Sequence, residues 1–270
     1  MTSVEATATR PRALVTGASS GIGQAFASRL ARDGYDLTIV ARRRDRLDEL
    51  ARQLGSTGAR IDVLPADLTD PADLRSVEAH IRDGEALAML VNNAGFGNYG
   101  PFVEADPDRA EEQIALHATA IVRLTRAALP GMVARKAGAV INVSSLLAFS
   151  GTPAVERPKR ATYAASKAYI NMFTRILAHE LAGSGVKVQA LCPGLVRTEF
   201  HDKLGGRSPG LPVMEPVDIV TASLAGLGLG EVICVPGLTD ATAIARFTEA
   251  EAAVLGAVRA ASIAERYTGT

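Results

Sequence analysis

The chain has 270 residues, of which 47% are apolar and 4% aromatic, with no tryptophan. Lysine plus arginine and aspartate plus glutamate number 29 each, so the formal net charge is zero. This length suits one large α/β domain. The charge balance and the few aromatic rings argue against nucleic acid or an anionic membrane as a partner.

Neither the N-terminus nor any apolar run has the pattern of a targeting or membrane segment. Residues 1–11 are polar and lack the apolar core of a secretory signal, so we expect a flexible tail there. The apolar runs are too short and too interrupted to span a bilayer. We therefore expect a soluble, cytoplasmic protein.

Short Val/Ile/Leu runs alternate with longer helical patterns along the chain, as is typical of parallel strands buried on both faces. Repeated βα units with right-handed crossovers predict a doubly wound α/β fold with helices on both faces of the sheet. The predicted strands are Arg12–Val15, Asp36–Ala41, Arg60–Pro65, Ala88–Val91, Ala139–Val143, Val186–Leu191 and Glu231–Val235. The predicted helices lie near Gly21–Asp33, Arg43–Leu54, Pro71–Arg82, Asp108–Ala134, Ala161–Ala182 and Pro216–Gly226.

The first predicted strand leads into Thr16-Gly-Ala-Ser-Ser-Gly-Ile-Gly23, which opens a helix. Gly17 permits a tight turn, Gly21 lets the backbone approach a pyrophosphate, and Gly23 allows close helix–strand packing. The N–H groups of the first helical turn then face the anion. The spacing departs from the usual dinucleotide fingerprint, and glycines alone also suit an ordinary strand–turn–helix connection. The other residues of the turn expected to contact a cofactor are Ser19, Ser20 and Ile22.

The second predicted strand ends in Val40-Ala41-Arg42-Arg43-Arg44, with no acidic residue. At this point of a dinucleotide fold an acidic side chain binds the 2′-hydroxyl of the adenosine ribose, whereas an arginine fork suits a 2′-phosphate. The pattern favours NADP(H) over NAD(H), with the phosphate assigned first to Arg42 and second to Arg43. The alternative is a solvated basic start to the next helix, which we expect for Arg44 and Arg46.

Two further strand ends carry polar residues. Asp67, followed by Leu68, is placed either to accept a hydrogen bond from an adenine amino group or to cap the helix near Pro71, although Thr69 and Asp70 are better placed as caps. After the fourth strand, two amides and a glycine suit a loop that packs against a cofactor; on their own they indicate only a turn. The residues of this loop expected at the cofactor are Asn93, Ala94 and Gly95.

The candidate chemistry lies after the fifth predicted strand, which closes on Ser144-Ser145. Tyr163 and Lys167 follow at the start of a long helix, one turn apart on the same face. A neighbouring ammonium lowers the pKa of a phenol, whose ordinary value is about 10. A serine hydroxyl at the strand end can hold a substrate oxygen against the tyrosine. The set suits proton transfer at an alcohol oxygen while a hydride passes to or from a nicotinamide.

The motifs Thr16–Gly23, Asn92–Gly95, Ser144-Ser145, Tyr163 with Lys167, and Pro193-Gly194 occur in the order and approximate spacing of the short-chain dehydrogenase/reductase family. From about Arg12 to Gly237 the chain resembles this family, in its NADP-preferring type. The resemblance implies a Rossmann-type fold, a seven-stranded parallel sheet in a three-layer α/β/α arrangement, within one catalytic domain over residues 12–270.

The resemblance also implies the roles of the site residues. Tyr163 would be the catalytic acid/base, Lys167 would bind the nicotinamide ribose and lower the tyrosine pKa, and Ser145 would orient the substrate. Thr198 matches the family's contact to the nicotinamide carboxamide. Tyr163 and Lys167 are thus also expected to contact the cofactor. The segment after the predicted strand Val186–Leu191, which contains Thr198, adds the expected contacts Pro193, Gly194 and Val196.

Two features depart from the family. His117 stands where the family usually has an asparagine whose backbone carbonyl holds a water bridging to the lysine; it is either a titrating member of the proton relay or a buried histidine satisfied by backbone. The separation of Ser145 from Tyr163 is longer than usual. We expect residues 151–160 to form an exposed, charged loop that lies either beside the substrate entrance or against a partner subunit.

Two further segments lie outside the motifs. Residues 199–216 have the composition of a substrate lid. Residues 241–266 have a helical pattern and either cap the sheet or pair with another subunit.

Taken together, these observations predict an NADP(H)-dependent oxidoreductase that interconverts a carbonyl compound and a secondary alcohol, as a ketone or aldehyde reductase. The alternatives are a catalytically silent NADP(H)-binding sensor or scaffold, and an epimerase or dehydratase with the same cofactor site.

The family resemblance suggests a homodimer or homotetramer built on the long helices. Cys192 and Cys234 are isolated thiols in apolar runs, so we expect them to pack in the core and predict no metal site.

Overall fold

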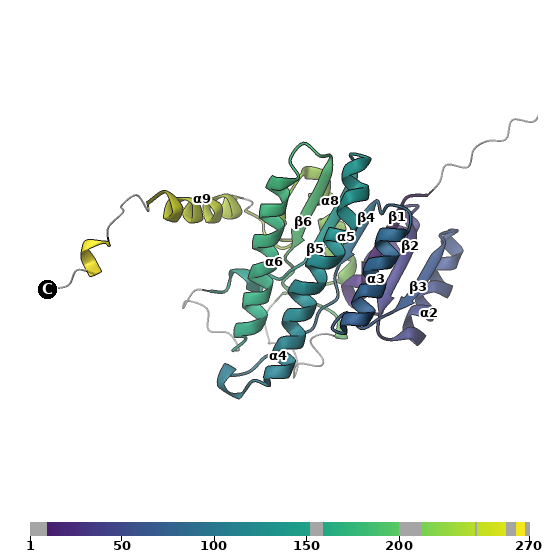
Figure 1. Ribbon diagram of the computed structural model, residues 1–270, viewed down its shortest axis with the longest axis horizontal. Helices are drawn as coiled ribbons and strands as arrows, with labels where there is room; N and C mark the ends of the chain where they lie inside the picture. The colour runs from purple at the N-terminus through teal and green to yellow at the C-terminus, as the bar shows by residue number, and fades with distance from the viewer. Residues whose placement is uncertain (1–9, 152–158, 200–211, 241, 258–262, 268–270) are drawn as a thin grey trace, which may run out of the picture. The chain divides into compact units, whose positions relative to one another are not determined.

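The computed structural model describes residues 10–151, 159–199, 212–240, 242–257 and 263–267. The chain forms two compact units, Met1–Pro236 and Gly237–Thr270. The first unit contains a seven-stranded sheet in the order β3-β2-β1-β4-β5-β6-β9, in which every neighbouring pair is parallel (Figure 1). The strands are β1 Arg12–Thr16, β2 Asp36–Ala41, β3 Ile61–Pro65, β4 Met89–Asn92, β5 Gly138–Val143, β6 Val186–Leu191 and β9 Ile233–Cys234.

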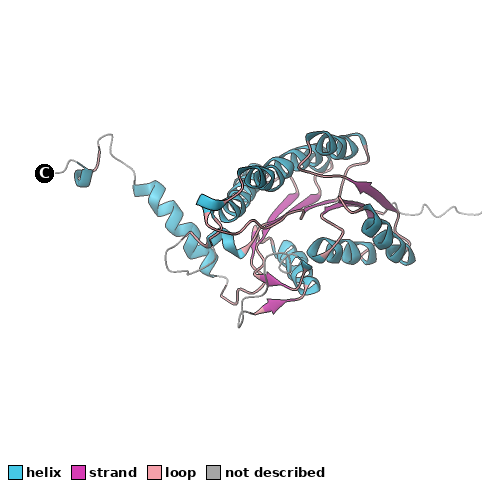
Figure 2. Ribbon diagram, turned by 90° about the horizontal axis from the view of Figure 1, so that it is seen from below, coloured by secondary structure: helices cyan, strands magenta, loops and turns pink. Residues whose placement is uncertain are grey.

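The sheet is buried on both faces because its apolar side chains alternate between two clusters. Along β1, Ala13 and Val15 point to one cluster and Leu14 to the other. The first cluster is closed by helices α1 Gly21–Arg32, α2 Arg44–Leu54 and α8 Pro216–Leu229. The second is closed by α3 Pro71–Asp83, α5 Ile121–Ala134 and α6 Ala161–Glu180. Figure 2 shows the sheet edge-on between its two helical layers, so the predicted three-layer, doubly wound fold is confirmed.

Local chemistry sets the helix ends. At the start of α3, the Asp70 carboxylate accepts hydrogen bonds from the backbone N–H groups of Ala72 (2.8 Å) and Asp73 (2.9 Å), and Pro71 occupies the first helical position. Asp70, rather than Asp67, is therefore the cap of this helix. Helix α8 continues three residues past its predicted end at Gly226 and stops at Gly230, which has a left-handed φ of 82°.

The predicted helix Asp108–Ala134 is wrong as a single α-helix. Helix α4, Pro107–Ile114, and helix α5 are joined by a π-helical segment, Ala115–Ala120, which contains His117. A π-helical turn carries an extra residue and shifts the faces that follow it, an irregularity often found at functional sites. Apolar periodicity alone does not reveal it.

Two other predicted ranges change at the carboxyl edge of the sheet. The predicted strand Glu231–Val235 shrinks to Ile233–Cys234, because the Glu231 N–H instead bonds to Gly226 O at the end of α8. Within the predicted lid, residues 200–211 lie outside the described residues. The described part of the lid contains strand β8, Val213–Met214, which pairs in parallel with β7, Leu195–Val196, just before the lid. Residues 152–158 of the charged loop also lie outside the described residues.

The N-terminal tail is described only from Arg10, whose guanidinium donates to Ala31 O (3.2 Å) and lies 3.4 Å from Asp36. In the second unit, helix α9 spans Thr242–Ala257, inside the range predicted to be helical. Asp240 precedes α9 and accepts a hydrogen bond from the Thr242 N–H at 3.0 Å. None of the side chains of α9 is buried.

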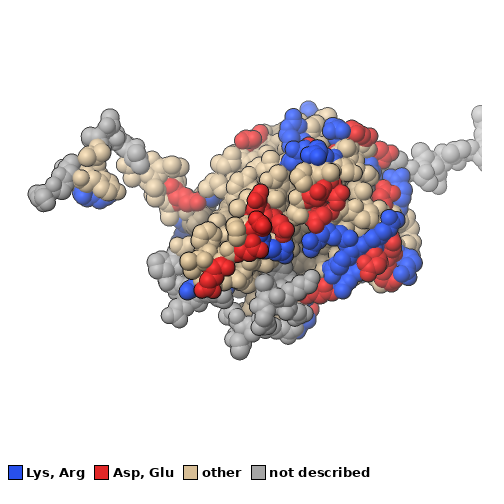
Figure 3. Space-filling view, turned by 60° about the horizontal axis from the view of Figure 1, so that its bottom comes forward, with Lys and Arg blue, Asp and Glu red and all other residues tan. Residues whose placement is uncertain are grey.

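The surface carries both signs of charge. Figure 3 shows acidic and basic side chains interspersed over the face that it presents. Among the described helices, none is both long enough and apolar enough for a membrane span.

Candidate active site

The carboxyl ends of the parallel strands bring the predicted motifs to one edge of the sheet. At the centre of this edge, the turn after β1 has positive φ at Gly17 (66°) and Gly21 (57°). A Cβ on Gly17 would lie 2.7 Å from Asn93 Nδ2, and a Cβ on Gly23 would overlap the Gly17 carbonyl oxygen. Ser20 precedes α1 without a side-chain cap, and the first turn of α1 has no acidic residue. The turn is therefore a tight cradle with helix N–H groups available to an anion.

The loop after β4 supports this turn. Asn93 Nδ2 donates to Thr16 O (2.9 Å), and Thr16 Oγ1 accepts from the backbone N–H groups of Asn93 (2.9 Å) and Ala94 (3.0 Å). The predicted cofactor residue Asn93 thus uses its side chain to hold the glycine-rich turn. Its neighbour Gly95 has no room for a side chain, since a Cβ would lie 2.8 Å from His117 Nε2.

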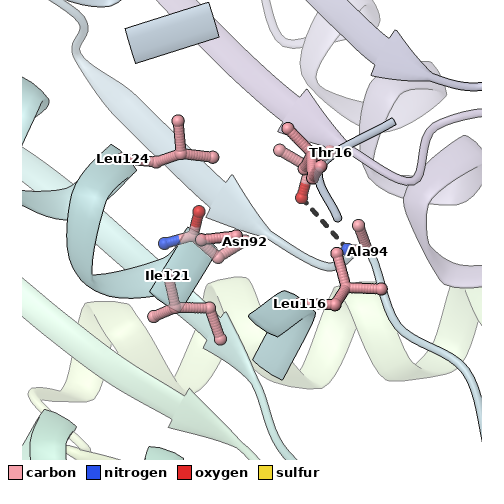
Figure 4. A pocket seen from close by; sticks show the side chains of 8 residues that line it. Thr16, Asn92, Ala94, Leu116, Ile121 and Leu124 are labelled. Atoms are coloured by element: carbon pink, nitrogen blue, oxygen red, sulfur yellow. Dashed lines mark hydrogen bonds between the residues drawn. The ribbon is translucent and has the colours of Figure 1, made fainter. Parts of the chain in front are cut away.

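Behind this loop, buried amides join two strands and two helices. Asn92 donates to Asn142 (2.8 Å) and Thr125 (3.1 Å), and Asn142 donates to Thr174 (3.0 Å). The Asn92 side chain also borders a cavity of about 10 Å³, close to the room that one water needs, between Thr16 and the residues of α5 (Figure 4). The bonds fix the end of β4 against β5 and α5, and β5 against α6, and these last two elements lead to the catalytic candidates.

The predicted phosphate-binding arginines both contact carboxylates. Arg42 Nη1 lies 3.5 Å from Asp67 Oδ2, and Arg43 Nη1 donates to Glu199 Oε2 at 3.0 Å. Arg43 also donates to the hydroxyls of Ser19 and Ser20, each at 2.9 Å from Nη2. Helix α2 begins at Arg44, one residue later than predicted, so Arg43 is outside the helix and turns toward the glycine-rich turn.

Asp67 is held locally. Its Oδ1 accepts from Thr69 N (3.0 Å) and Thr69 Oγ1 (2.7 Å). Burial pushes the Asp67 pKa up, but the Thr69 hydrogen bonds and the Arg42 charge together bring it below its ordinary value. The Leu68 side chain is buried in the second apolar cluster, so only its backbone is placed to face a cofactor.

Ser145, Tyr163 and Lys167 are brought together where β5 ends and α6 begins. Ser145 caps the 3₁₀ turn Leu146–Phe149 by accepting from Leu147 N (3.1 Å), and it hydrogen-bonds the Tyr163 hydroxyl. Lys167 Nζ donates to Val143 O (2.9 Å) and lies 5.6 Å from the centre of the Tyr163 ring. The predicted constellation therefore assembles, with all three side chains buried.

The predicted lowering of the Tyr163 pKa by Lys167 is not found. Burial is the largest influence and raises the Tyr163 pKa, while the Ser145 hydrogen bond and the Arg160 charge act in the opposite direction. Burial also lowers the pKa of Lys167 to about 7. Because an ammonium in this apolar setting readily loses its proton, it has less charge to give the phenol than a solvated lysine.

The segment that follows β6 forms the remaining part of the site at this edge of the sheet. Leu146 N donates to Pro193 O (2.9 Å), and Val196 is buried where β7 pairs with β8. A Cβ on Gly21 would lie 2.8 Å from Thr198 Cγ2, so Thr198 lies directly against the glycine-rich turn. A groove of about 910 Å³ opens here between α1 and α8, bordered by Gly21, Thr198 and Glu199.

The sequence profile of the short chain dehydrogenase family matches residues 11–207. The chain belongs to this family. A short-chain dehydrogenase from Sphingobium yanoikuyae, solved in complex with NADPH, is 37% identical and has a TM-score of 0.89 over 95% of this chain and 100% of that one. The bulky-bulky ketone specific alcohol dehydrogenase from Comamonas testosteroni is 34% identical, with a TM-score of 0.85 over 95% and 98% of the two chains. Oxidoreductase UcpA from Salmonella typhimurium is 36% identical over 197 residues, or 73% of each chain.

His117 is the main departure from the short-chain dehydrogenase pattern. Its side chain is fully buried, Nδ1 lies 2.9 Å from Ser166 Oγ, and Nε2 has no hydrogen-bond partner among the described residues. Burial, reinforced by the Lys167 charge, lowers the His117 pKa well below its ordinary value. The ring meets Tyr163 edge-on with 5.8 Å between centres. The histidine is therefore neutral, and within the described part of the chain only one of its two ring nitrogens is satisfied.

Sequence reasoning missed Tyr99 and Arg160. The Tyr99 ring meets the Tyr163 ring edge-on at 5.5 Å, and the Arg160 guanidinium lies 4.9 Å from the centre of the Tyr99 ring. A backbone bond from Gly100 N to Lys159 O (2.7 Å) fixes the two segments together. The available signal is the aromatic residue four positions after Gly95, in a loop at the carboxyl edge.

The cysteines behave as core residues. Cys192 and Cys234 are buried and unpaired, and burial raises the pKa of each thiol to about 12. The described part of the chain has no group of three or more His, Cys, Asp or Glu side chains placed for a metal ion.

Proposed function

We propose that the protein is an NADP(H)-dependent oxidoreductase that interconverts a carbonyl compound and a secondary alcohol. The observation that carries the proposal is the meeting of Ser145, Tyr163 and Lys167 at the sheet edge that also holds the glycine-rich turn. Relatives that are named dehydrogenases and oxidoreductases support the same class of reaction. Reduction is the expected direction in a cytoplasm that keeps its NADPH pool reduced.

The residues of the edge fit the cofactor. The cradle at Gly17 and Gly21, which side chains would fill, would hold the pyrophosphate at the N-terminus of α1. Arg42 and Arg43 would hold the 2′-phosphate, and the NADPH bound to the Sphingobium relative supports this cofactor. When bound, NADP(H) supplies or accepts the hydride. The other proposed contacts are Ser19, Ser20, Ile22, Gly23, Asp67, Leu68, Asn93, Ala94, Gly95, Pro193, Gly194, Val196 and Thr198.

The protein's own groups handle the proton. In reduction, the Tyr163 hydroxyl gives its proton to the carbonyl oxygen, and the Ser145 hydroxyl donates a hydrogen bond to the same oxygen. The Lys167 ammonium donates one of its three hydrogens to Val143 O. The other two are available to the nicotinamide ribose and to the proton path that returns a proton to Tyr163. His117 is a further member of this proton path, through the acceptor lone pair of its Nε2.

The test is turnover of a panel of ketones and aldehydes with NADPH. We expect NADPH consumption with at least one carbonyl compound, and a loss of about a hundredfold or more in kcat for Tyr163→Phe. Tyr267→Phe, which changes an exposed tyrosine of the second unit, is the matched control and should retain full activity.

The other outcomes separate the alternatives. NADPH binding without turnover of any carbonyl compound would favour a silent NADP(H)-binding sensor or scaffold. Conversion of a substrate without net NADPH consumption would favour an epimerase or dehydratase that uses the same cofactor site.

A further inference from the structure

Glu199 lies between two of the arginines that follow β2. Its Oε2 accepts from Arg43 Nη1 at 3.0 Å, and its Oε1 forms an ion pair with Arg46. The two arginines hold the pKa of Glu199 near 2, so its carboxylate is charged at all working pH values. The sequence separates Glu199 from both arginines by more than half the chain. Only Arg43 was assigned to the cofactor site, whereas Arg46 was expected to be a solvated residue at the start of helix α2 and pairs with Glu199 instead.

The hydrogen bonds of Arg43 are almost fully used by this arrangement. A guanidinium has five N–H donors. Nε and Nη2 donate to Ser19 Oγ, Nη2 also donates to Ser20 Oγ, and Nη1 donates to Glu199. A phosphate cannot take a bidentate hold on Arg43 until at least one of these acceptors leaves.

Glu199 is the acceptor best suited to leave. The side chains of Arg43, Arg46 and Glu199 are 34%, 44% and 43% exposed, so water can replace either partner, and such half-exposed pairs are individually weak. A phosphate monoester carries more negative charge than a carboxylate and offers three strong acceptor oxygens. The hydroxyls of Ser19 and Ser20, by contrast, belong to the turn itself.

We propose that Glu199 is a specificity-determining residue that competes with the 2′-phosphate of NADP(H) for Arg43 and Arg46. In this exchange the Arg43–Glu199 bond breaks and an Arg43–phosphate bond forms, so part of the phosphate's binding free energy is used to displace the carboxylate. The residue therefore weakens NADPH binding and leaves NADH, which has no 2′-phosphate, unaffected. This inference rests on the proposed cofactor but not on turnover of any carbonyl compound.

The test is equilibrium binding of NADPH and NADH to wild type and Glu199→Gln. The glutamine keeps the size and one acceptor oxygen but removes the charge. We expect the NADPH Kd to fall about three- to tenfold, the range for releasing two half-exposed ion pairs, and the NADH Kd to stay within about twofold. The gain should shrink as salt is added, because salt screens both exchanged partners.

The matched control is Glu215→Gln, which removes a carboxylate from the same groove where it pairs with Arg197 instead. It should leave both dissociation constants unchanged. An unchanged or raised NADPH Kd in Glu199→Gln would overturn the proposal, because Glu199 would then be neutral or would hold Arg43 ready for the phosphate. An equal change for NADH would overturn it too.

The binding experiment tests the role of Glu199 independently of the turnover experiment, which tests the proposed activity. If wild type binds NADPH without reducing any carbonyl compound, the proposed activity falls while the comparison of Glu199→Gln still decides this inference. If wild type does not bind NADPH, both the assigned cofactor and the competition are wrong.

Discussion

The hydrogen bonds of Ser166 determine the tautomer of His117. Ser166 has a single hydroxyl hydrogen, and it donates that hydrogen to Tyr163 O at 2.9 Å. The 2.9 Å contact with His117 must then run the other way, with Nδ1–H donating to Ser166 Oγ. In a neutral imidazole, Nε2 consequently carries a lone pair and no hydrogen. This lone pair lies beside Gly95, on the side where a Cβ would also approach Lys167 Nζ at 3.7 Å.

An acceptor beside Lys167 stabilises the ammonium form, directly or through one water. Asparagine carries its acceptor oxygen one atom nearer the backbone than Nε2, so it does not reach the same place. We therefore expect His117→Asn to lower the pKa of Lys167 further, to reduce kcat at pH 7 by about tenfold, and to move the basic limb of the kcat profile to lower pH. KM should change little. The control is His179→Asn, an exposed histidine on α6. A wild-type profile in His117→Asn would mean that only the backbone at this position matters.

Residue-level prediction works where a residue's role follows from its place on a strand or helix. Ser145, Tyr163 and Lys167 assemble as predicted because a strand end and one helical face bring them together. Tyr99 and Glu199 were not predicted, since their contacts join loops whose paths no periodicity describes. The pKa of Tyr163 was predicted in the wrong direction because burial, which the sequence does not show, outweighs the nearby charges.

At the scale of elements, the junction of β1 and α1 depends on close backbone approach. Gly23→Ala places a Cβ against the Gly17 carbonyl oxygen, so we expect a loss of about 1–3 kcal/mol in the free energy of unfolding and loss of NADPH binding. Gly228→Ala is the control, since a Cβ there meets nothing within 4 Å near the end of α8. It should be neutral or stabilising by up to about 1 kcal/mol. Denaturant unfolding checks both, and equal stability of the two variants would contradict this account.

Element boundaries were predicted closely where apolar runs are buried on both faces. Strands β2 and β6 have the predicted limits because their side chains reach both apolar clusters. The π-helical segment around His117 was missed because one inserted residue leaves the apolar pattern of α4 and α5 intact. The second unit has no such pattern of burial, and the proposal of one domain over residues 12–270 stays a prediction.

At the scale of the whole molecule, α6 presents an apolar stripe to the outside. Tyr169, Met172 and Ile176 recur at helical spacing and are 43%, 49% and 51% exposed. We propose that a second copy of the chain covers this stripe, in a homodimer or homotetramer. Met172→Glu should then give monomers by light scattering, whereas Val217→Glu, at an exposed position on α8, should not. A monomeric wild type at all concentrations would contradict the proposal.

The order of the strands also bears on how the chain is made. Strand β1 lies between β2 and β4, so β1, β2 and β3 can pair while the remainder of the chain is still being synthesised. Until β4 arrives, the backbone of Ala13–Val15 that later pairs with Met89–Val91 is an open sheet edge and a template for another nascent chain. A strand that is fully buried in the folded enzyme is thus a point of aggregation risk during translation.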